Sequence, residues 1–194
     1  MPTPASATGS RRFGHRGLAR PINPEKTCSV TVITGDVGQA VRAAGGWMCD
    51  RVRAGWRVSA LMPAICDSTP LQILGVRVCT FGTALDESWL TPRPVALAIG
   101  IEATPLPNPI RALIHALVRD PDIEITVWGE GRFSAEHRFE HVRHQLSPAA
   151  RAFKEHAMRA TSLSAPIEPT ESFRSCAPWY PLDHGVELDR VIGR

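Results

Sequence analysis

Three histidines near the end of the chain, His137, His141 and His144, have the spacing of a possible metal site. On a helix, positions i, i+4 and i+7 share one face, and catalytic zinc is commonly held by three protein ligands. The segment has no H-E-x-x-H pattern, however, and Arg138 and Arg143 flank the histidines. We therefore interpret the group as a solvated, charged helix face and predict no metal there.

A second group of chemically capable residues follows expected strands. Gly35, Asp36 and Gly38 come directly after an apolar run, in the first strand-to-helix turn. In doubly wound α/β folds, ligands bind outside the carboxyl ends of the strands, and this turn often holds a phosphate. The turn lacks the glycine pattern of dinucleotide-binding proteins and that of P-loops, and the Asp36 carboxylate would repel a phosphate. A plain capped turn is the favoured interpretation, and a nucleotide at the strand tips remains the alternative.

Further polar side chains are expected at the same edge of the sheet. The candidate ligand-binding residues are Gly35, Asp36, Gly38, Cys66, Asp67 and Glu130, and Glu102 is expected near them. Cys66 lies beside Asp67 at the end of the second expected strand, but no partner histidine can be identified for a nucleophilic cysteine. No G-x-S-x-G motif is present. The catalytic residues and any cofactor therefore remain unknown at this stage.

The amino-terminal segment contains the densest basic cluster, formed by Arg11, Arg12, Arg16 and Arg20, with Phe13 among them. Such an arm could lie along a nucleic-acid backbone, because arginine neutralises phosphates and an aromatic ring can stack on bases. The alternative is a solvated tail.

The elements that must position these residues are organised around residues 29–63. A buried strand is predicted from the β-branched residues Val30, Val32 and Ile33. Asp36 is the expected N-cap of the helix that follows, and Gly55 marks the expected end of that helix. A second strand follows, so the unit predicts a right-handed βαβ crossover. The glycine pair at 45–46 within the helix indicates close packing, with a kink as the alternative. Five strands are expected, over residues 29–34, 56–62, 76–81, 95–101 and 123–128.

The rest of the pattern sets the domain organisation. Residues 1–27 are expected to be a disordered arm, 28–160 a three-layer, Rossmann-like α/β domain with about five mainly parallel strands, and 161–194 a proline-containing, flexible tail. A long helix is expected over residues 134–160, split at Pro148 and restarted by Ser147 as a cap.

Composition limits the class of protein. The chain has 194 residues, is 43% hydrophobic and carries a formal charge of +3. Its five cysteines are odd in number and form no C-x-x-C pair, which argues against a disulfide framework or a structural zinc site. We predict a cytoplasmic protein with no membrane span, and the oligomeric state is not predicted.

Three segments carry a resemblance: AGGWMCDRVRAGWRVSALMP, PLQILGVRV and LSPAARAFKEHAM. They are similar to small uncharacterised α/β proteins of actinobacteria, to which no activity is attached. The resemblance covers the middle of the chain and the late helix, and it implies no catalytic residues.

Three functional hypotheses follow. The first is a regulatory protein that binds nucleic acid through its basic arm, with a nucleotide as a possible modulator. The second is an enzyme that acts on a small or nucleotide-like substrate in a Rossmann-like cleft. The third is a protein-interaction module.

Overall fold

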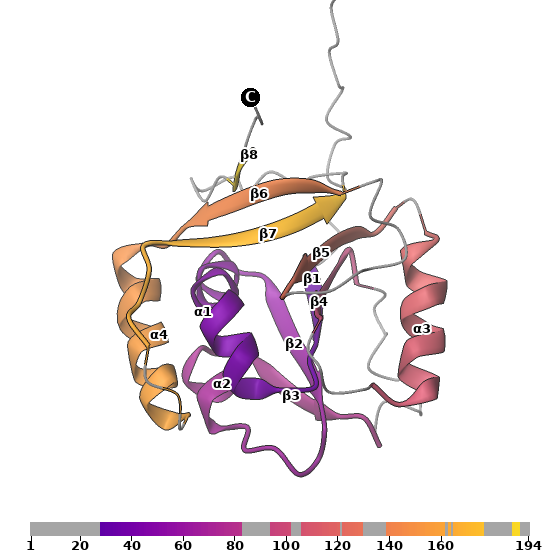
Figure 1. Ribbon diagram of the computed structural model, residues 1–194, viewed down its shortest axis with the longest axis horizontal. Coiled ribbons are helices and arrows are strands. Elements are labelled where there is room, and N and C mark those ends of the chain that lie inside the picture. The colour runs from indigo at the N-terminus through magenta and orange to yellow at the C-terminus, as the bar shows by residue number, and fades with distance from the viewer. Residues whose placement is uncertain are drawn as a thin grey trace, which may run out of the picture.

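The computed structural model describes residues 28–82, 94–101, 106–120, 122–129, 139–161, 163, 165–176 and the backbone of 188–190. These residues form one mixed sheet with helices on both faces (Figure 1). The arginines of the amino-terminal cluster, Glu102, Glu130 and His137 lie outside the described residues.

The parallel half of the sheet contains the five expected strands. They are β1 (Ser29–Ile33), β2 (Arg57–Met62), β3 (Arg77–Thr80), β4 (Ala96–Gly100) and β5 (Glu124–Trp128). Their order is β3-β2-β1-β4-β5, and every neighbouring pair among them is parallel. All five residues of β1, β4 and β5 are buried, as expected for strands covered on both faces.

The other half is antiparallel and was not expected. β7 (Thr170–Cys176) pairs with β5, β6 (Glu140–Gln145) pairs with β7, and β8 (Leu188–Arg190) pairs with β6. The sheet therefore has eight strands in the described residues, and the expected count of five is wrong. The expected helix from residue 134 is also wrong over 140–145, and the expected tail contains a central strand at 170–176.

In the described residues, four helices cover the sheet. On one face, α1 (Val37–Arg53), α2 (Thr69–Ile73) and α4 (Pro148–Ala160) enclose the larger core, while α3 (Asn108–Val118) packs on the other face with Ile33, Leu97 and Ile125. Figure 1 shows this division, with α3 standing apart from the other three helices.

The local signals at the ends of α1 and at the start of α4 were interpreted correctly. Asp36 is the N-cap of α1, Gly55 has the left-handed φ of 85°, and Ser147 caps α4, which begins at Pro148. Gly46 is where α1 approaches its neighbours most closely, since a Cβ there would lie 2.3 Å from Cδ2 of Leu146. Gly46 therefore has the packing role that we expected, whereas a Cβ at Gly45 would make only ordinary contacts, at 3.4 Å or more.

Candidate active site at the carboxyl edge of the parallel strands

The strand order places a topological switch point between β1 and β4, where a crevice is expected at the edge of the sheet. β1 pairs with β2 on one side and with β4 on the other. The helix after β1 packs on one face of the sheet, and the helix after β4 packs on the opposite face. The connections after these two neighbouring strands therefore diverge, and such a switch point is where open α/β sheets bind ligands.

The turn after β1 stands at this position and is rigidly built. Thr34 is fully buried, and its Oγ1 donates to the backbone oxygen of Asp36 at 2.7 Å and accepts from the Asp36 N–H at 3.1 Å. Oδ1 of Asp36 accepts from the Gln39 N–H at 3.0 Å. Asp36 itself is only partly buried. The turn therefore holds a partly accessible carboxylate at the amino end of the 17-residue helix α1.

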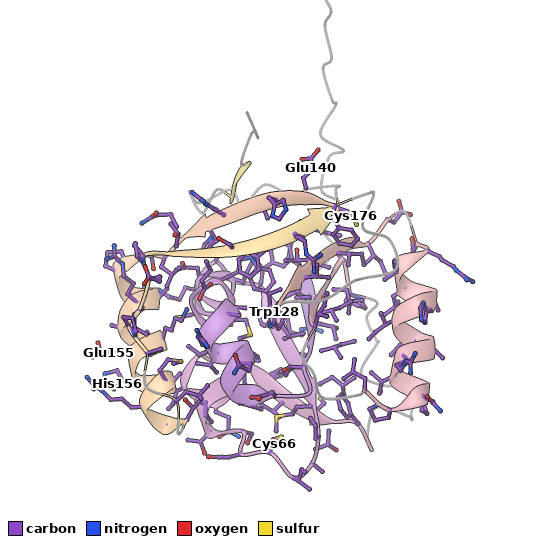
Figure 2. The ribbon with its side chains drawn as sticks, in the orientation of Figure 1. Cys66, Trp128, Glu140, Glu155, His156 and Cys176 are labelled. Atoms are coloured by element: carbon purple, nitrogen blue, oxygen red, sulfur yellow. The ribbon has the colours of Figure 1, made fainter. Side chains whose placement is uncertain are left out.

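Cys66, in the loop after β2, lies against the same helix end. The Val37 N–H and the Asp36 carboxylate both act on the charge of its sulfur. Burial raises the pKa of the Cys66 thiol, the negative charge of Asp36 raises it further, and the Val37 N–H only partly opposes both. The group is therefore a thiol at neutral pH and a poor nucleophile. Figure 2 shows Cys66 at the lower edge of the view.

Asp67 has a different role from its neighbour Cys66. Its Oδ1 accepts from the Thr69 N–H at 2.9 Å and from the Thr69 hydroxyl at 2.8 Å, and these bonds lower the pKa of Asp67. The side chain is exposed and organises the start of α2. Of the candidate ligand-binding residues, Gly35, Asp36 and Gly38 lie at the start of α1, and the Asp36 charge acts on Cys66. Asp67 instead bonds to Thr69, the first residue of α2.

The interpretation of the histidines as a solvated helix face is wrong, because His141 and His144 lie on a strand and His144 is buried. On β6, His141 is exposed, whereas His144 is fully buried, so the two rings do not share a face. In the part of the chain that the structure describes, no group of three or more His, Cys, Asp or Glu residues could hold a metal ion.

His144 instead belongs to a buried cluster with Asp50 and Ser147. Nε2 of His144 lies 2.9 Å from Oδ2 of Asp50, and the Ser147 hydroxyl donates to Oδ1 of Asp50 at 2.6 Å. Burial alone would raise the pKa of Asp50, but the hydrogen bonds from His144 and Ser147 outweigh it and lower this pKa. In a serine hydrolase the histidine stands between serine and aspartate. Here the aspartate is central and the histidine is buried, so the cluster fastens α1 to β6 and α4.

A second buried pair holds the middle of α1. Nζ of Lys154 donates to Oε1 of Glu171 at 2.6 Å and to the backbone oxygen of Arg42 at 2.7 Å. The N–H groups of Gly46 and Trp47 donate to the two oxygens of Glu171 at 2.8 and 2.7 Å. Sequence patterns could not reveal this arrangement, because its partners are 17 to 125 residues apart in the chain.

A third polar contact lies near the end of α1, where Arg51 is buried to 1% exposure. Its guanidinium stacks 4.2 Å from the ring centroid of Trp56 and 5.2 Å from that of Trp47, and Nη2 lies 3.7 Å from Oε1 of Glu124. This stacking surrounds the charge with aromatic faces and ties α1 to the amino end of β5.

A groove of about 630 Å³ opens beside the end of α4. It is lined by Glu155, Met158, Arg159, Thr161, Leu163, Ala165, Pro166 and Ile167. Leu163 is also the side chain closest to Gly38, at the amino end of α1. Among its lining residues in the described part of the chain, Leu163 is the one that reaches toward the amino end of α1.

Comparisons with known proteins identify the fold. No protein-family model matches the chain, and no curated protein matches it significantly. The zinc-inhibited form of teicoplanin deacetylase Orf2 is similar in structure, with a TM-score of 0.51 and 11% identity over 68% of this chain and 82% of that one. The A40926 pseudoaglycone deacetylase Dbv21 gives a TM-score of 0.48 and 13% identity over 69% and 80% of the two chains.

These comparisons correct the first functional hypothesis. The structure that matches with a TM-score of 0.51 is that of a deacetylase, and the likeness covers 68% of this chain. The interpretation as a DNA-binding regulatory protein with a nucleotide modulator is therefore wrong, and the enzyme alternative fits better. In the described residues, no helix is long and apolar enough to cross a membrane.

Proposed function

We propose that this protein is an enzyme that hydrolyses an N-acyl bond in a Rossmann-like cleft at the carboxyl edge of its parallel strands. The observation that carries the proposal is the position of Asp36, a partly accessible carboxylate at the β1–β4 switch point, capping α1. The fold shared with a deacetylase favours the reaction class.

The groups at this edge suit the hydrolysis of an amide. The cap bond to Gln39 uses Oδ1 of Asp36, and a carboxylate can accept several hydrogen bonds, so Asp36 can bind a water molecule and take its proton. The water oxygen adds to the acyl carbon, the proton passes to Asp36 and then to the leaving nitrogen, and the C–N bond breaks. The products are a carboxylic acid and an amine.

The negative charge that develops on the acyl oxygen needs a positive environment. The amino end of α1 provides one, because the helix dipole places partial positive charge there. The thiol of Cys66, which stays protonated at neutral pH, is a donor in the same place. Asp36 is therefore assigned as the general base, and α1 with Cys66 as the site for the acyl oxygen.

A metal ion would be an alternative source of this polarisation, since catalytic zinc is held by three protein ligands. Asp36 and Cys66 are the two ligand-type side chains that meet at this edge in the described residues. No group of three or more such side chains is present in that part of the chain. The donor set there does not fit a catalytic zinc, and the proposed steps use none.

The proposal is tested by release of acid from N-acetylated amino sugars, amino acids and polyamines, measured by proton NMR. Asp36→Asn keeps an equally good N-cap but cannot take a proton, so we expect about 10²–10⁴-fold slower release with unchanged thermal stability. Asp67→Asn is the matched control, because it changes an exposed cap carboxylate nearby, and it should retain the wild-type rate.

Two results would overturn the proposal. One is the absence of acid release from every compound by the wild-type protein. The other is an Asp36→Asn variant that is as fast as Asp67→Asn.

A further inference from the structure

The middle of α1 makes hydrogen bonds that leave the helix. In a regular α-helix the N–H of Gly46 would bond to the C=O of Arg42, four residues earlier. Here the N–H groups of Gly46 and Trp47 donate to the two carboxylate oxygens of Glu171 at 2.8 and 2.7 Å. The C=O of Arg42 accepts from Nζ of Lys154 at 2.7 Å, and the same Nζ donates to Glu171 at 2.6 Å. The ion pair thus bridges two groups that a regular helix would join directly.

The two members of this pair act as caps on opposite sides of one point in α1. A carboxylate that accepts the first N–H groups of a helix is an N-terminal cap, and a basic side chain on the last C=O groups stabilises a C-terminus. Glu171 has the first role toward Gly46 and Trp47. Lys154 has the second role toward Arg42. β7 supplies the first cap and α4 the second, and Figure 1 shows these two elements on different sides of α1.

The glycine pair leaves the space that this arrangement needs. A Cβ on Gly46 would lie 3.2 Å from Oε1 of Glu171 and 2.3 Å from Cδ2 of Leu146. A Cβ on Gly45 would lie 3.5 Å from Cγ of Lys154. Glycine also weakens a helix locally, and glycine pairs and inserted side chains are both known causes of a bend. In α1, consecutive glycines occur only where the ion pair enters it.

The parts of α1 on the two sides of this point are held differently. After it, Asp50 and Arg51 make directional polar contacts with β6, the cap of α4 and β5. Before it, the buried side chains are small and apolar: Val37, Ala40, Val41 and Ala44. Apolar contacts are not directional, so they keep this segment against the core without fixing its angle. The bridge adds a directional contact at the inner end of the segment.

We propose that the Lys154–Glu171 bridge divides α1 into two segments, 37–45 and 46–53, and sets the orientation of the first. Because the first segment begins at the Asp36 cap, Lys154 and Glu171 are positioning residues for this carboxylate. Their catalytic consequence rests on the proposed function, whereas the division of the helix does not.

Loss of the bridge should change the shape of α1. The N–H groups of Gly46 and Trp47 would need other acceptors, since buried N–H groups are almost always paired. The acceptors at hand are the carbonyl groups four residues earlier. α1 should therefore close into a regular helix and turn its amino end.

The test removes the pair without leaving a charge. Lys154→Met with Glu171→Met replaces both residues by unbranched apolar side chains of similar size, an exchange that buried ion pairs often tolerate. NMR couplings across hydrogen bonds identify the acceptor of each amide. In the wild type, the amides of Gly46 and Trp47 should couple to the side-chain carboxyl carbon of Glu171. In the double variant they should couple to the carbonyl carbons four residues earlier.

Two further measurements report what the bridge does. Residual dipolar couplings give the orientation of residues 38–45 relative to 48–53, which should differ between the double variant and the wild type. Acid release, assayed where both proteins are fully folded, should be slower in the double variant by up to about 10²-fold, because a displacement of about 1 Å can cost that much. The loss should appear in kcat more than in KM, since the general base is displaced.

Glu155→Met with Arg159→Met is the matched control, because it removes an ion pair from the exposed face of the same helix α4. It should keep the wild-type couplings, orientation and rate. Glu171→Asp is the milder variant if the first double variant does not fold. It keeps the charge but draws the carboxylate back by one methylene, so it should weaken the couplings to Gly46 and Trp47, change the orientation and lower kcat.

The outcomes separate this inference from the proposed function. Wild-type amides that couple only to the carbonyl carbons four residues earlier overturn the inference, and so does an orientation that survives removal of the pair. A changed orientation with an unchanged kcat removes the positioning role. If the wild type releases no acid, the hydrolase fails, whereas the couplings and the orientation still decide whether α1 is divided.

Discussion

Glu171 is the side chain whose replacement tests how α1 is held in place. It extends from β7 into the middle of α1 and is buried to 4% exposure. Its two oxygens accept three short hydrogen bonds, from the N–H groups of Gly46 and Trp47 and from the ammonium of Lys154. Burial raises the pKa of Glu171, and these three donors oppose the rise. All three partners are hydrogen-bond donors, whereas a protonated carboxyl group would need an acceptor for its O–H. The geometry therefore requires the ionised carboxylate.

Glu171→Gln keeps the size of the side chain but removes its charge. One amide oxygen replaces two carboxylate oxygens, so the new NH₂ group faces a donor, and the Lys154 ammonium is left buried without its counterion. Removing one partner of a buried ion pair costs about 3–5 kcal/mol. With a urea m-value of about 2 kcal/mol/M, the unfolding midpoint should fall by about 1.5–2.5 M.

Equilibrium unfolding in urea, followed by tryptophan fluorescence, measures this shift. The matched control is Glu155→Gln, which breaks the exposed Glu155–Arg159 pair on α4 and should cost no more than about 0.5 kcal/mol. Adding Lys154→Met to Glu171→Gln removes the stranded charge and should recover part of the loss. The reasoning is refuted if Glu171→Gln costs no more than Glu155→Gln.

Two further predictions concern α1 itself. Gly46→Ala should destabilise the protein by about 1–3 kcal/mol, because the added Cβ would overlap Leu146. At Gly45 the nearest atom to an added Cβ is 3.4 Å away, so Gly45→Ala should stabilise the protein by up to about 1 kcal/mol through helix propensity. Equal effects of the two substitutions in urea unfolding would contradict this. The pKa of Asp50 is lowered in the folded state from its ordinary value of 3.8, so its contribution to stability is fully present above that value and is lost as the pH falls through the folded pKa. Asp50→Asn should therefore cost most stability above about pH 5 and progressively less below pH 3.8, and a cost independent of pH would contradict the assignment.

The parallel half of the fold could be predicted from the sequence because its own residues specify it. β1, β4 and β5 lie in the middle of the sheet and are buried along their whole length, so each appears as a short apolar run. The turn signals between them are local as well, since Asp36 and Ser147 satisfy helix N–H groups three residues away.

The antiparallel half could not be predicted, because several of its buried positions are polar. On β6 the inward residues are Val142 and His144, and the sequence around them has apolar residues at helical spacing as well. On β7 the inward residues include Glu171 and Ser175, so the segment resembles a polar tail. Their partners lie on α1 and β5, far away in the sequence, and only the folded chain shows that these polar groups are satisfied.

The candidate site was predictable in part. The rule that ligands bind at the carboxyl ends of parallel strands pointed to Asp36 and Cys66, which the structure brings together. It also pointed to Asp67, whose cap with Thr69 is a local alternative that the same sequence allows. The groove could not be predicted, because the segment that forms its wall, including Leu163, approaches α1 only through tertiary packing.

These two halves of the sheet depend on each other through α1. The amino end of this helix carries the candidate site, whereas three polar contacts hold its middle and its second half: Glu171 with Lys154, Asp50 with His144 and Ser147, and Arg51 with Glu124. Glu124 belongs to β5 in the parallel half, and Lys154 and Ser147 belong to α4 and its cap. His144 and Glu171 lie on β6 and β7, the strands that the sequence patterns did not reveal. A buried ionic contact tolerates little displacement, because each group moved out of place leaves an unpaired charge. The antiparallel half therefore helps to fix where α1 presents Asp36, through His144 and Glu171.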